Sequence, residues 1–292
     1  MKKINIFCFG FGQVAKNFVY NLNKTYDVNL AVTSRDKTQK KNFYGINYIS
    51  YHFLDDSFDK EILKKIKNYD YILVSIPPKN GIDIVIKHFQ ETFEILKSNW
   101  ITYLSATSVY GDHSGEWVDE NSKVNPSTEN GKSRLNVEKI WINIAKKKNL
   151  PIQIFRLSGI YSQERNILEK IKSGSHQIIN KPDHFFSRIH VEDISNVLKI
   201  SLDSKYIKSG EIYNLSDDYP CSNIEVANYA YKMMKFPKPK MIEINEIKNE
   251  MLRNFYKDSK KVSNKKIKKV FSYKLKFPTY KEGLSRIYDH FI

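Results

Sequence analysis

The 292-residue sequence is poor in the residues that build disulfide frameworks and metal centres. It has only two cysteines, of which Cys8 lies in an apolar run and Cys221 in a polar turn, and its seven histidines form no pair at ligand spacing. We therefore expect neither a disulfide scaffold nor a metal site. Two such cysteines suit a reducing compartment, so we expect a cytoplasmic protein.

Long apolar runs are also missing. No stretch approaches 18 consecutive apolar residues, and the apolar run that starts at Ile4 is short and interrupted by glycine. The sequence therefore predicts neither a membrane-spanning helix nor a signal peptide. It also shows no internal repeat and no linker-like segment of low complexity.

Negative charge is scarce, with 48 Lys and Arg against 32 Asp and Glu. Residues 232–292 hold seventeen Lys and Arg but only six Asp and Glu, so most of the excess lies in the last fifth of the chain. We favour a solvated basic surface over a surface that binds a nucleotide diphosphate or a nucleic acid. Neither a zinc-finger spacing nor a glycine–aromatic RNA-binding signature is present, which disfavours nucleic acid.

Apolar runs alternate with amphipathic segments along the first half of the chain. Five strands are predicted, at Ile4–Phe9, Val28–Thr33, Tyr71–Ile76, Ile101–Ser105 and Ile152–Leu157. Helices are predicted after the first strand and at Asp59–Lys67, Ile82–Lys97 and Ser133–Lys148. Near-continuously apolar strands separated by helices predict an α/β fold with a doubly wound parallel sheet.

The pattern loosens after Leu157, with a further helix at Val191–Leu202 and a late strand at Glu211–Leu215. The chain is long enough for one large domain and a smaller lobe. We predict a Rossmann domain over 1–160 with 187–216, and a small C-terminal α/β substrate lobe over 161–186 with 217–292.

A glycine-rich turn joins the first predicted strand to its helix. In a Rossmann turn the first glycine permits the bend, the second lets the backbone approach a pyrophosphate, and a small third residue allows close packing. Those three positions are filled by Gly10, Gly12 and Ala15, with Gln13 and Val14 between the last two. The strand-turn-helix context favours a dinucleotide site over a turn that binds nothing.

The second predicted strand ends in Thr33-Ser34-Arg35, where a protein that prefers NAD would offer Asp or Glu to the ribose. A guanidinium pairs well with a 2′-phosphate, so Ser34 and Arg35 favour NADP over NAD, although Asp36 follows one residue later. The third strand runs into Ser75-Ile76-Pro77, at the edge where such sheets bind ligands. The prolines there are explained equally well by the need to stop the strand.

Two phrases stand about twenty residues apart, SATSVYG at Ser105–Gly111 and NGKSRLNVEK at Asn130–Lys139. With SRIHVEDI at Ser187–Ile194, in this order and spacing, they resemble the atypical extended short-chain dehydrogenases/reductases, relatives of the nucleotide-sugar epimerases and dehydratases. The resemblance covers nearly the whole chain. It implies an NAD(P)-binding oxidoreductase, epimerase or dehydratase that acts on a nucleotide-sugar-like or other polar anionic substrate.

The chain departs from the catalytic pattern of that family. Where the family has a Ser or Thr three positions before Val109, this chain has Ala106, and where it has Tyr and Lys, this chain has Asn130 and Arg134. An amide neither gives nor takes a proton near neutral pH. Arg134 keeps a cation that would hold the cofactor's ribose, but its pKa is too high for a proton relay.

A replacement for the missing acid is sought among residues near the carboxyl edge of the sheet. The candidates are Tyr110, His113 and Tyr161 and the hydroxyls of Ser105 and Thr107, with Arg134 as the cation. The alternative for Tyr110 is a packing role with a satisfied hydroxyl. His113 and His190 are interpreted as a loop residue and a structural residue.

The resemblance also suggests residues on the substrate side. Arg165 follows the sixth family strand and Arg188 precedes the next helix, and both are candidates for an anion contact. Further candidates for the substrate side are Ser108, Tyr161 and Asn166. In this family the helix that here carries Asn130 often pairs with the same helix of a second subunit, so a homodimer is possible. A rival interpretation is a non-catalytic NADP-binding sensor, favoured by the three lost proton-handling positions.

Overall fold

The computed structural model describes residues 1–290, which form two compact units. Unit 1 comprises Met1–Ala106, Lys132–Arg156 and Ile194–Tyr213. Unit 2 comprises Thr107–Gly131, Leu157–Asp193 and the chain from Asn214 onward. The domain division predicted from the sequence stays a prediction.

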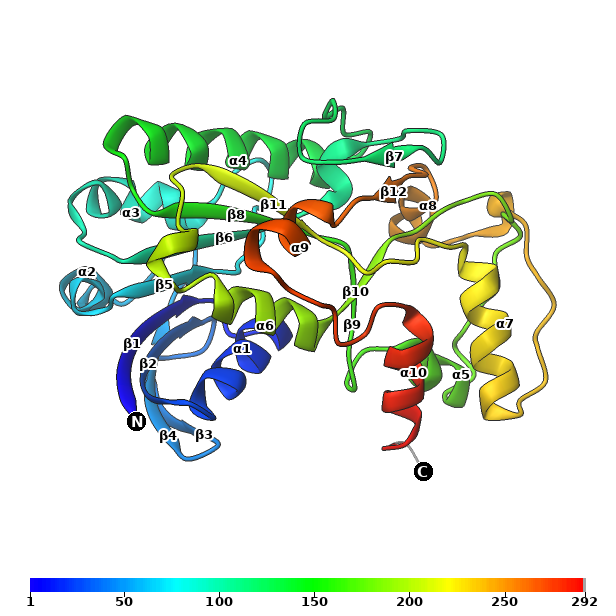
Figure 1. Cartoon of the computed structure of the whole chain (residues 1–292), viewed down its shortest axis with the longest axis horizontal. Coiled ribbons are helices and arrows are strands. Elements are labelled where there is room, and N and C mark those ends of the chain that lie inside the picture. The colour runs from blue at the N-terminus through cyan, green and yellow to red at the C-terminus, as the bar shows by residue number, and fades with distance from the viewer. Residues whose placement is uncertain (291–292) are drawn as a thin grey trace. The chain divides into compact units, whose positions relative to one another are not determined.

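An eight-stranded sheet dominates the fold, with strand order β11-β8-β6-β5-β1-β2-β4-β3 (Figure 1). The pairs that β1 makes with β2 and β5, β5 with β6, and β2 with β4 are all parallel. This confirms the predicted α/β class with a doubly wound parallel sheet. The strands are β1 (Lys2–Phe9), β2 (Tyr26–Ser34), β3 (Gln39–Phe43), β4 (Ile46–His52), β5 (Tyr71–Val74), β6 (Trp100–Ala106), β8 (Ile152–Leu157) and β11 (Glu211–Leu215).

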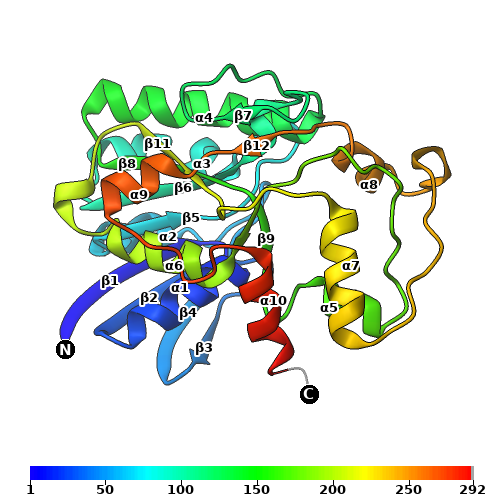
Figure 2. The same ribbon diagram turned by 45° about the vertical axis from the view of Figure 1, so that its right-hand side comes forward.

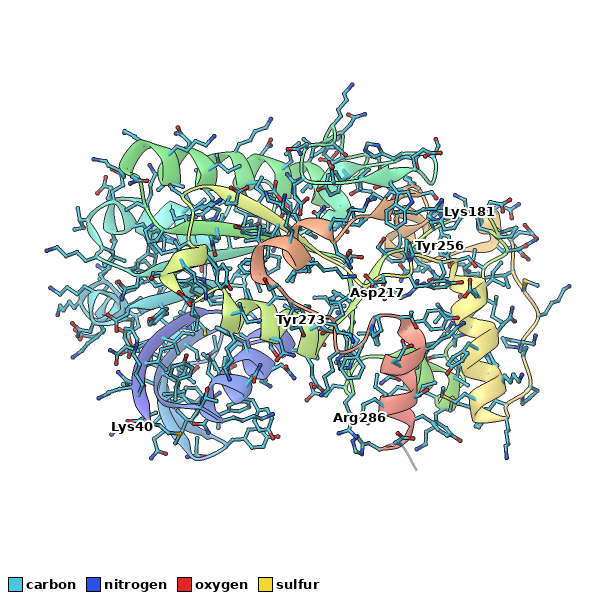
Figure 3. All side chains as sticks on the ribbon, in the orientation of Figure 1. Lys40, Lys181, Asp217, Tyr256, Tyr273 and Arg286 are labelled. Carbon is cyan, nitrogen blue, oxygen red and sulfur yellow. The ribbon has the colours of Figure 1, made fainter. Side chains whose placement is uncertain are left out.

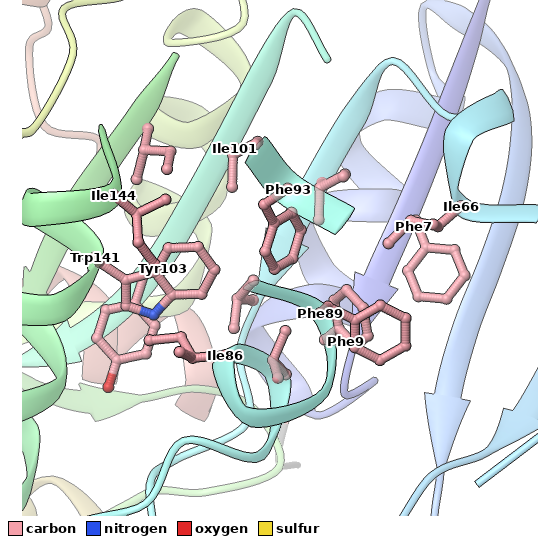
Figure 4. Packing of buried hydrophobic residues seen from close by; sticks show 14 of the residues in the cluster. Phe7, Phe9, Ile66, Ile86, Phe89, Phe93, Ile101, Tyr103, Trp141 and Ile144 are labelled. Carbon is pink, nitrogen blue, oxygen red and sulfur yellow. The ribbon is translucent and has the colours of Figure 1, made fainter. Parts of the chain in front are cut away.

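Helices cover both faces of this sheet. On one face, α3 and α4 bury Phe93 and Trp141 against Tyr103 of β6, in the core shown in Figure 4. On the other face, Phe18 of α1 lies 5.9 Å from the ring of Trp100. The helices are α1 (Gln13–Asn23), α2 (Glu61–Lys65), α3 (Ile84–Ile95), α4 (Glu129–Lys148) and α6 (Val191–Ile200), with 3-10 turns η1 (Ile66–Asn68) and η3 (Ser204–Tyr206).

A β-hairpin stands between β2 and α2, where the sequence predicted neither strand. Strands β3 and β4 pair antiparallel, and their two-residue turn has positive φ at Tyr44 (47°) and Gly45 (84°). This is the backbone of the primed turns that match the twist of a hairpin. Phe11 of the glycine turn packs against Phe43 and Tyr48, at ring distances of 5.2 and 5.5 Å. The hairpin is thereby fastened to the predicted cofactor turn.

Unit 2 contains two short parallel ribbons and a helical layer. The ribbons pair β9 (Gly159–Tyr161) with β10 (Arg188–His190), and β7 (Trp117–Val118) with β12 (Lys261–Val262). Helices α5, α7 and α10 share an apolar core that includes Leu168, Ala230 and Leu284 (Figure 2). The helices are α5 (Ile167–Lys172), α7 (Asn223–Met234), α8 (Glu250–Phe255), α9 (Lys265–Phe271) and α10 (Tyr280–Tyr288), with 3-10 turns η2 (Thr107–Tyr110) and η4 (Ile244–Glu246).

Several lysines of the basic C-terminal region are paired within unit 2. Lys276 lies 2.5 Å from a carboxylate oxygen of Glu192, and Lys260 lies 3.7 Å from Asp258. Lys268 forms an ion pair with Asp218. Part of the positive charge is therefore paired within unit 2 itself. Within residues 1–290, no helix has the length and apolar content needed to cross a membrane.

Candidate functional site

The glycine turn after β1 requires glycine at its first position. Gly10 has φ of +85°, and a Cβ placed there would come within 2.9 Å of Oγ of Ser75 and 3.0 Å of Ile76. Its amide donates a hydrogen bond of 2.9 Å to Oγ1 of Thr33. The turn is therefore held against the ends of β2 and β5, where a side chain would push it away.

The helix α1 that follows starts without a side-chain cap. Its N-cap residue is Gly12, whose missing Cβ would meet no atom within 4 Å, and its first turn carries no acidic residue. Val14 and Ala15 are buried, whereas Gly12 is exposed. The first amides of a helix lack intrahelical acceptors and carry partial positive charge. This end of α1, which includes Gln13, is thus shaped for an anion such as a pyrophosphate.

The end of β2 contacts the glycine turn through Thr33 and is followed by the exposed guanidinium of Arg35. Arg35 is exposed, and no described residue pairs with its guanidinium, while its carbonyl oxygen lies 3.1 Å from Nδ1 of His52. Ser34 accepts a hydrogen bond of 3.0 Å from the hydroxyl of Ser50. The carboxylate of Asp36, the competing ribose contact, lies 3.4 Å from Nζ of Lys41.

The end of β5 is tied to the glycine turn through Ser75. Its hydroxyl donates to the carbonyl oxygens of Phe9 and Gly10, at 3.0 and 3.2 Å. Ile76 is half-buried against the core of unit 1, and Pro77 is exposed. The predicted cofactor residues from the three strand ends are therefore brought together within unit 1.

The end of β6 carries a buried hydroxyl that lacks a hydrogen-bond partner. Ser105 is 2% exposed, and its Oγ contacts no donor or acceptor among residues 1–290. Buried polar atoms are nearly always hydrogen-bonded, and an orphaned one calls for an explanation. A ligand oxygen or nitrogen at the sheet edge would satisfy it. Ala106, one residue later, offers no hydroxyl.

Arg134 contacts the C-terminal end of strand β6. Its Nη1 donates to the carbonyl oxygen of Leu104, at 3.4 Å, and its guanidinium lies next to the phenol of Tyr103. Burial raises the pKa of Tyr103, and the charge of Arg134 opposes that rise. The neighbouring Ser133 accepts a hydrogen bond of 2.9 Å from the amide of Gly81. Tyr103, Ser133 and Gly81 were not predicted, because their contacts join segments far apart in the sequence.

In unit 2, the phenol of Tyr110 is already engaged. The side chain is fully buried, and its hydroxyl donates to Oδ1 of Asn214, at 2.8 Å. Thr107 and Ser108 are half-buried in η2, and Asn130 is exposed at the start of α4. The contact with Asn214 is the satisfied-hydroxyl alternative considered for Tyr110, whose catalytic role stays a prediction.

Among the predicted substrate residues, Tyr161 and Asn166 make contacts that stabilise unit 2. The hydroxyl of Tyr161 faces Gly283 of α10, where a Cβ would overlap it, and lies 3.4 Å from the carbonyl oxygen of Thr279. Asn166 caps α5, since its side chain accepts from the amide of Glu169 at 3.0 Å. Arg165, in contrast, is exposed, and no described residue pairs with its guanidinium.

Arg188 is a half-buried cation whose guanidinium donates to neutral acceptors. Its Nη1 donates to the carbonyl oxygens of Phe186 and Cys221, at 3.0 and 3.2 Å, and its Nη2 donates to Oδ1 of Asn223. Asn223 in turn donates 2.9 Å to the hydroxyl of Tyr256, which Figure 3 labels. The guanidinium is thereby oriented without losing its charge to a carboxylate. Among residues 1–290, no group of three or more His, Cys, Asp and Glu could hold a metal ion.

Solved structures share this fold over nearly its whole length. A protein from Silicibacter pomeroyi described as functionally unknown is 29% identical, with 98% of each chain covered and a TM-score of 0.83. A dTDP-glucose 4,6-dehydratase from Bacillus anthracis in complex with NAD is 16% identical, with coverage of 98% and 97% and a TM-score of 0.77. A UDP-glucuronic acid 4-epimerase from Bacillus cereus in complex with NAD is 16% identical, with 98% of each chain covered and a TM-score of 0.78.

No protein-family model and no curated protein matches the chain by sequence. The chain has the fold of NAD-dependent epimerases and dehydratases, and the resemblance predicted from its motifs is confirmed at this level. Its place among the atypical members stays a prediction.

Proposed function

We propose that this protein binds a nicotinamide dinucleotide and acts as an oxidoreductase, epimerase or dehydratase on a nucleotide-sugar-like or other polar anionic substrate. The observation that carries the proposal is the turn at Gly10 with the uncapped start of α1, since together they form an anion site at the edge of a parallel sheet. Bound there, the dinucleotide would supply hydride transfer. Solved proteins of the same fold hold NAD.

For the cofactor we favour NADP. The guanidinium of Arg35, which pairs with no residue in 1–290, suits a 2′-phosphate, whereas the carboxylate of Asp36 lies 3.4 Å from Nζ of Lys41. Gly10, Gly12, Gln13, Val14 and Ala15 would hold the pyrophosphate.

The remaining cofactor contacts would come from three places in unit 1. Ser34 would support the ribose phosphate, Ser75, Ile76 and Pro77 would line the strand end, and Arg134 would hold the nicotinamide ribose. The orphaned hydroxyl of Ser105 fits a polar group at the same edge.

On the substrate side, the half-buried charge of Arg188 and the exposed charge of Arg165 would attract an anionic group. Thr107 and Ser108 would offer hydroxyls to the substrate.

The two buried, unpaired cysteines suit a reducing compartment such as the cytoplasm. A homodimer through α4 stays a prediction, and the exposed side of that helix carries Lys132, Lys139 and Lys146.

A second candidate function is a non-catalytic NADP sensor. It is favoured by Ala106 and Asn130 at proton-handling positions, and by the hydroxyl of Tyr110 being bonded to Asn214. Both functions share the dinucleotide site, so binding alone does not separate them.

The test is turnover with NADPH and a panel of nucleotide sugars, followed by absorbance at 340 nm and product masses. The enzyme predicts turnover that Arg134→Ala removes and that Arg134→Lys, which keeps the cation, largely retains. NADPH binding without turnover by the wild type supports the sensor. In that case turnover should be assayed in the triple variant Ala106→Ser/Asn130→Tyr/Arg134→Lys. This variant restores the family's catalytic residues, and a gain of turnover would show that their loss had removed catalysis. Failure to bind both NADPH and NADH would contradict both functions.

A further inference from the structure

Asp217 stands just after β11 in unit 2, and its backbone is attached to β10. Its amide donates a hydrogen bond of 2.6 Å to the carbonyl oxygen of Arg188, and the hydroxyl of Ser216 donates to the same oxygen at 3.4 Å. The side chain is 1% exposed, and Figure 3 labels its place. Asp217 is therefore fixed next to the residue that carries the predicted anion contact.

One oxygen of this carboxyl group lacks a partner. Oδ1 accepts a hydrogen bond of 3.2 Å from the amide of Tyr219, whereas Oδ2 has no hydrogen-bond partner among residues 1–290. Asp193, a second buried carboxylate in unit 2, shows the contrast. Its two oxygens accept from the hydroxyl of Tyr273 and from the amides of Lys276 and Phe277. An orphaned carboxyl oxygen at this depth indicates either a bound proton or a ligand.

The charges around Asp217 favour the protonated form at neutral pH. Burial raises its pKa to about 8, and Arg188 of β10 opposes this rise without cancelling it. Asp218 on the same loop and Asp193 of α6 raise the pKa further. The other titratable groups that face it are Tyr161 of β9 and Cys221. Because Oδ1 accepts from Tyr219, the proton belongs on Oδ2, which then becomes a donor.

We propose that Asp217 is a ligand-binding residue whose Oδ2–H donates a hydrogen bond to an oxygen of an anionic ligand held by Arg188. The proposal deepens the function above and rests on it. A donor without an acceptor among residues 1–290, on a residue bonded to the backbone of Arg188 and subject to the charge of its guanidinium, fits an oxyanion. The oxygen belongs to a phosphate, as in a nucleotide diphosphate, or to a carboxylate, as in a uronic acid. A neutral carboxyl group can donate a hydrogen bond to an oxyanion, whereas an ionised carboxylate has no proton to donate and would repel it.

The sign of the pH dependence follows from this arrangement. Loss of the proton above pH 8 removes the donor and places a negative charge next to the bound anion. Affinity should therefore fall as the pH rises, approaching tenfold per pH unit for one linked proton. Asp217→Asn keeps an N–H donor of the same shape and cannot ionise. It should bind at neutral pH much as the wild type does, and its affinity should stay constant up to pH 9.5.

The experiment is calorimetric titration of the full chain with UDP, with glucuronate and with UDP-glucuronic acid, between pH 7 and 9.5. A pH-dependent affinity for UDP identifies the phosphate as the partner, and one for glucuronate identifies the carboxylate. Asp217→Ala, which has no donor, should bind the same probe more weakly at every pH. Equal pH dependence in the wild type and Asp217→Asn would overturn the inference.

Failure of all three probes to bind would also overturn it, while the dinucleotide proposal would still be decided by NADPH titration. A second measurement does not depend on a variant that folds. Carbon-13 NMR of the Asp217 carboxyl group in the wild type should show a pKa that rises when the probe is added, and an unchanged pKa would contradict the proposal.

Discussion

The carboxylate of Glu138 on α4 and the guanidinium of Arg156 on β8 form a buried ion pair, one helical turn after Arg134. Nε of Arg156 lies 3.1 Å from Oε1, and Nη2 lies 2.7 Å from Oε2. Glu138 is 1% exposed and Arg156 is 3% exposed, so each buried charge depends on the other for its neutralisation.

Replacing one member of this pair should be costly. Glu138→Gln leaves a buried guanidinium without its counter-charge, and we expect a loss of about 3–5 kcal/mol in the free energy of unfolding. Replacing both, as in Glu138→Leu/Arg156→Met, should cost much less, because no uncompensated charge remains. Urea unfolding measures both variants. The exposed pair Glu61 and Lys64 provides the control, since Lys64→Ala should hardly change the midpoint. A double variant as unstable as the single one would contradict this explanation.

Gly111 in unit 2 is required for two separable reasons. Its φ is +75°, and a Cβ there would overlap the carbonyl oxygen of Asn125. Gly174 has a similar φ of +67° but open space around it. Gly174→Ala should therefore cost only the backbone strain, about 1–2 kcal/mol. Gly111→Ala adds overpacking, for a total of about 2–5 kcal/mol. Thermal unfolding of the two variants compares them, and equal losses would mean that the close contact has no effect.

His190 should make the protein less stable in acid. The ring is buried, accepts from the amide of Glu192 at Nδ1, and packs 4.1 Å from the ring of Phe277. Burial lowers its pKa to about 4, against 6.5 for an ordinary histidine. Between these values the unfolded chain binds more protons than the folded one, so stability rises with pH across this window. In His190→Asn, the slope of the unfolding free energy against pH should fall by up to about 1.4 kcal/mol per unit.

Chemical denaturation from pH 4 to 6.5 measures this slope in both proteins. The buried carboxyl groups with raised pKa contribute the opposite slope, but they are present in both proteins and cancel in the difference. An unchanged slope would mean that His190 is protonated in the folded protein.

The sequence predicted the parallel sheet because its strands are near-continuous apolar runs, such as Ile4–Phe9 and Ile152–Leu157. The β3–β4 hairpin escaped prediction because residues 39–52 mix polar and aromatic residues. Its turn also uses Tyr44 before Gly45, where Asn or Asp would have been the recognisable signal.

Some residues of the candidate site could likewise be predicted from the sequence, and others could not. The turn at Gly10 was predictable because its residues are consecutive and their roles are backbone roles. The engagement of Tyr110 by Asn214 was not, since these residues are 104 positions apart. Likewise, the orphaned oxygen of Asp217 depends on what surrounds it in the folded unit, which no local pattern encodes.

The central claim is that unit 1 binds NADP through the glycine turn and Arg35, and a pair of dissociation constants tests it most directly. Calorimetric titration of the wild type should give tighter binding of NADPH than of NADH, by about tenfold or more for a phosphate held by a guanidinium. Arg35→Ala should weaken NADPH and leave NADH nearly unchanged. Equal or tighter binding of NADH by the wild type, or failure to bind either nucleotide, would contradict the claim.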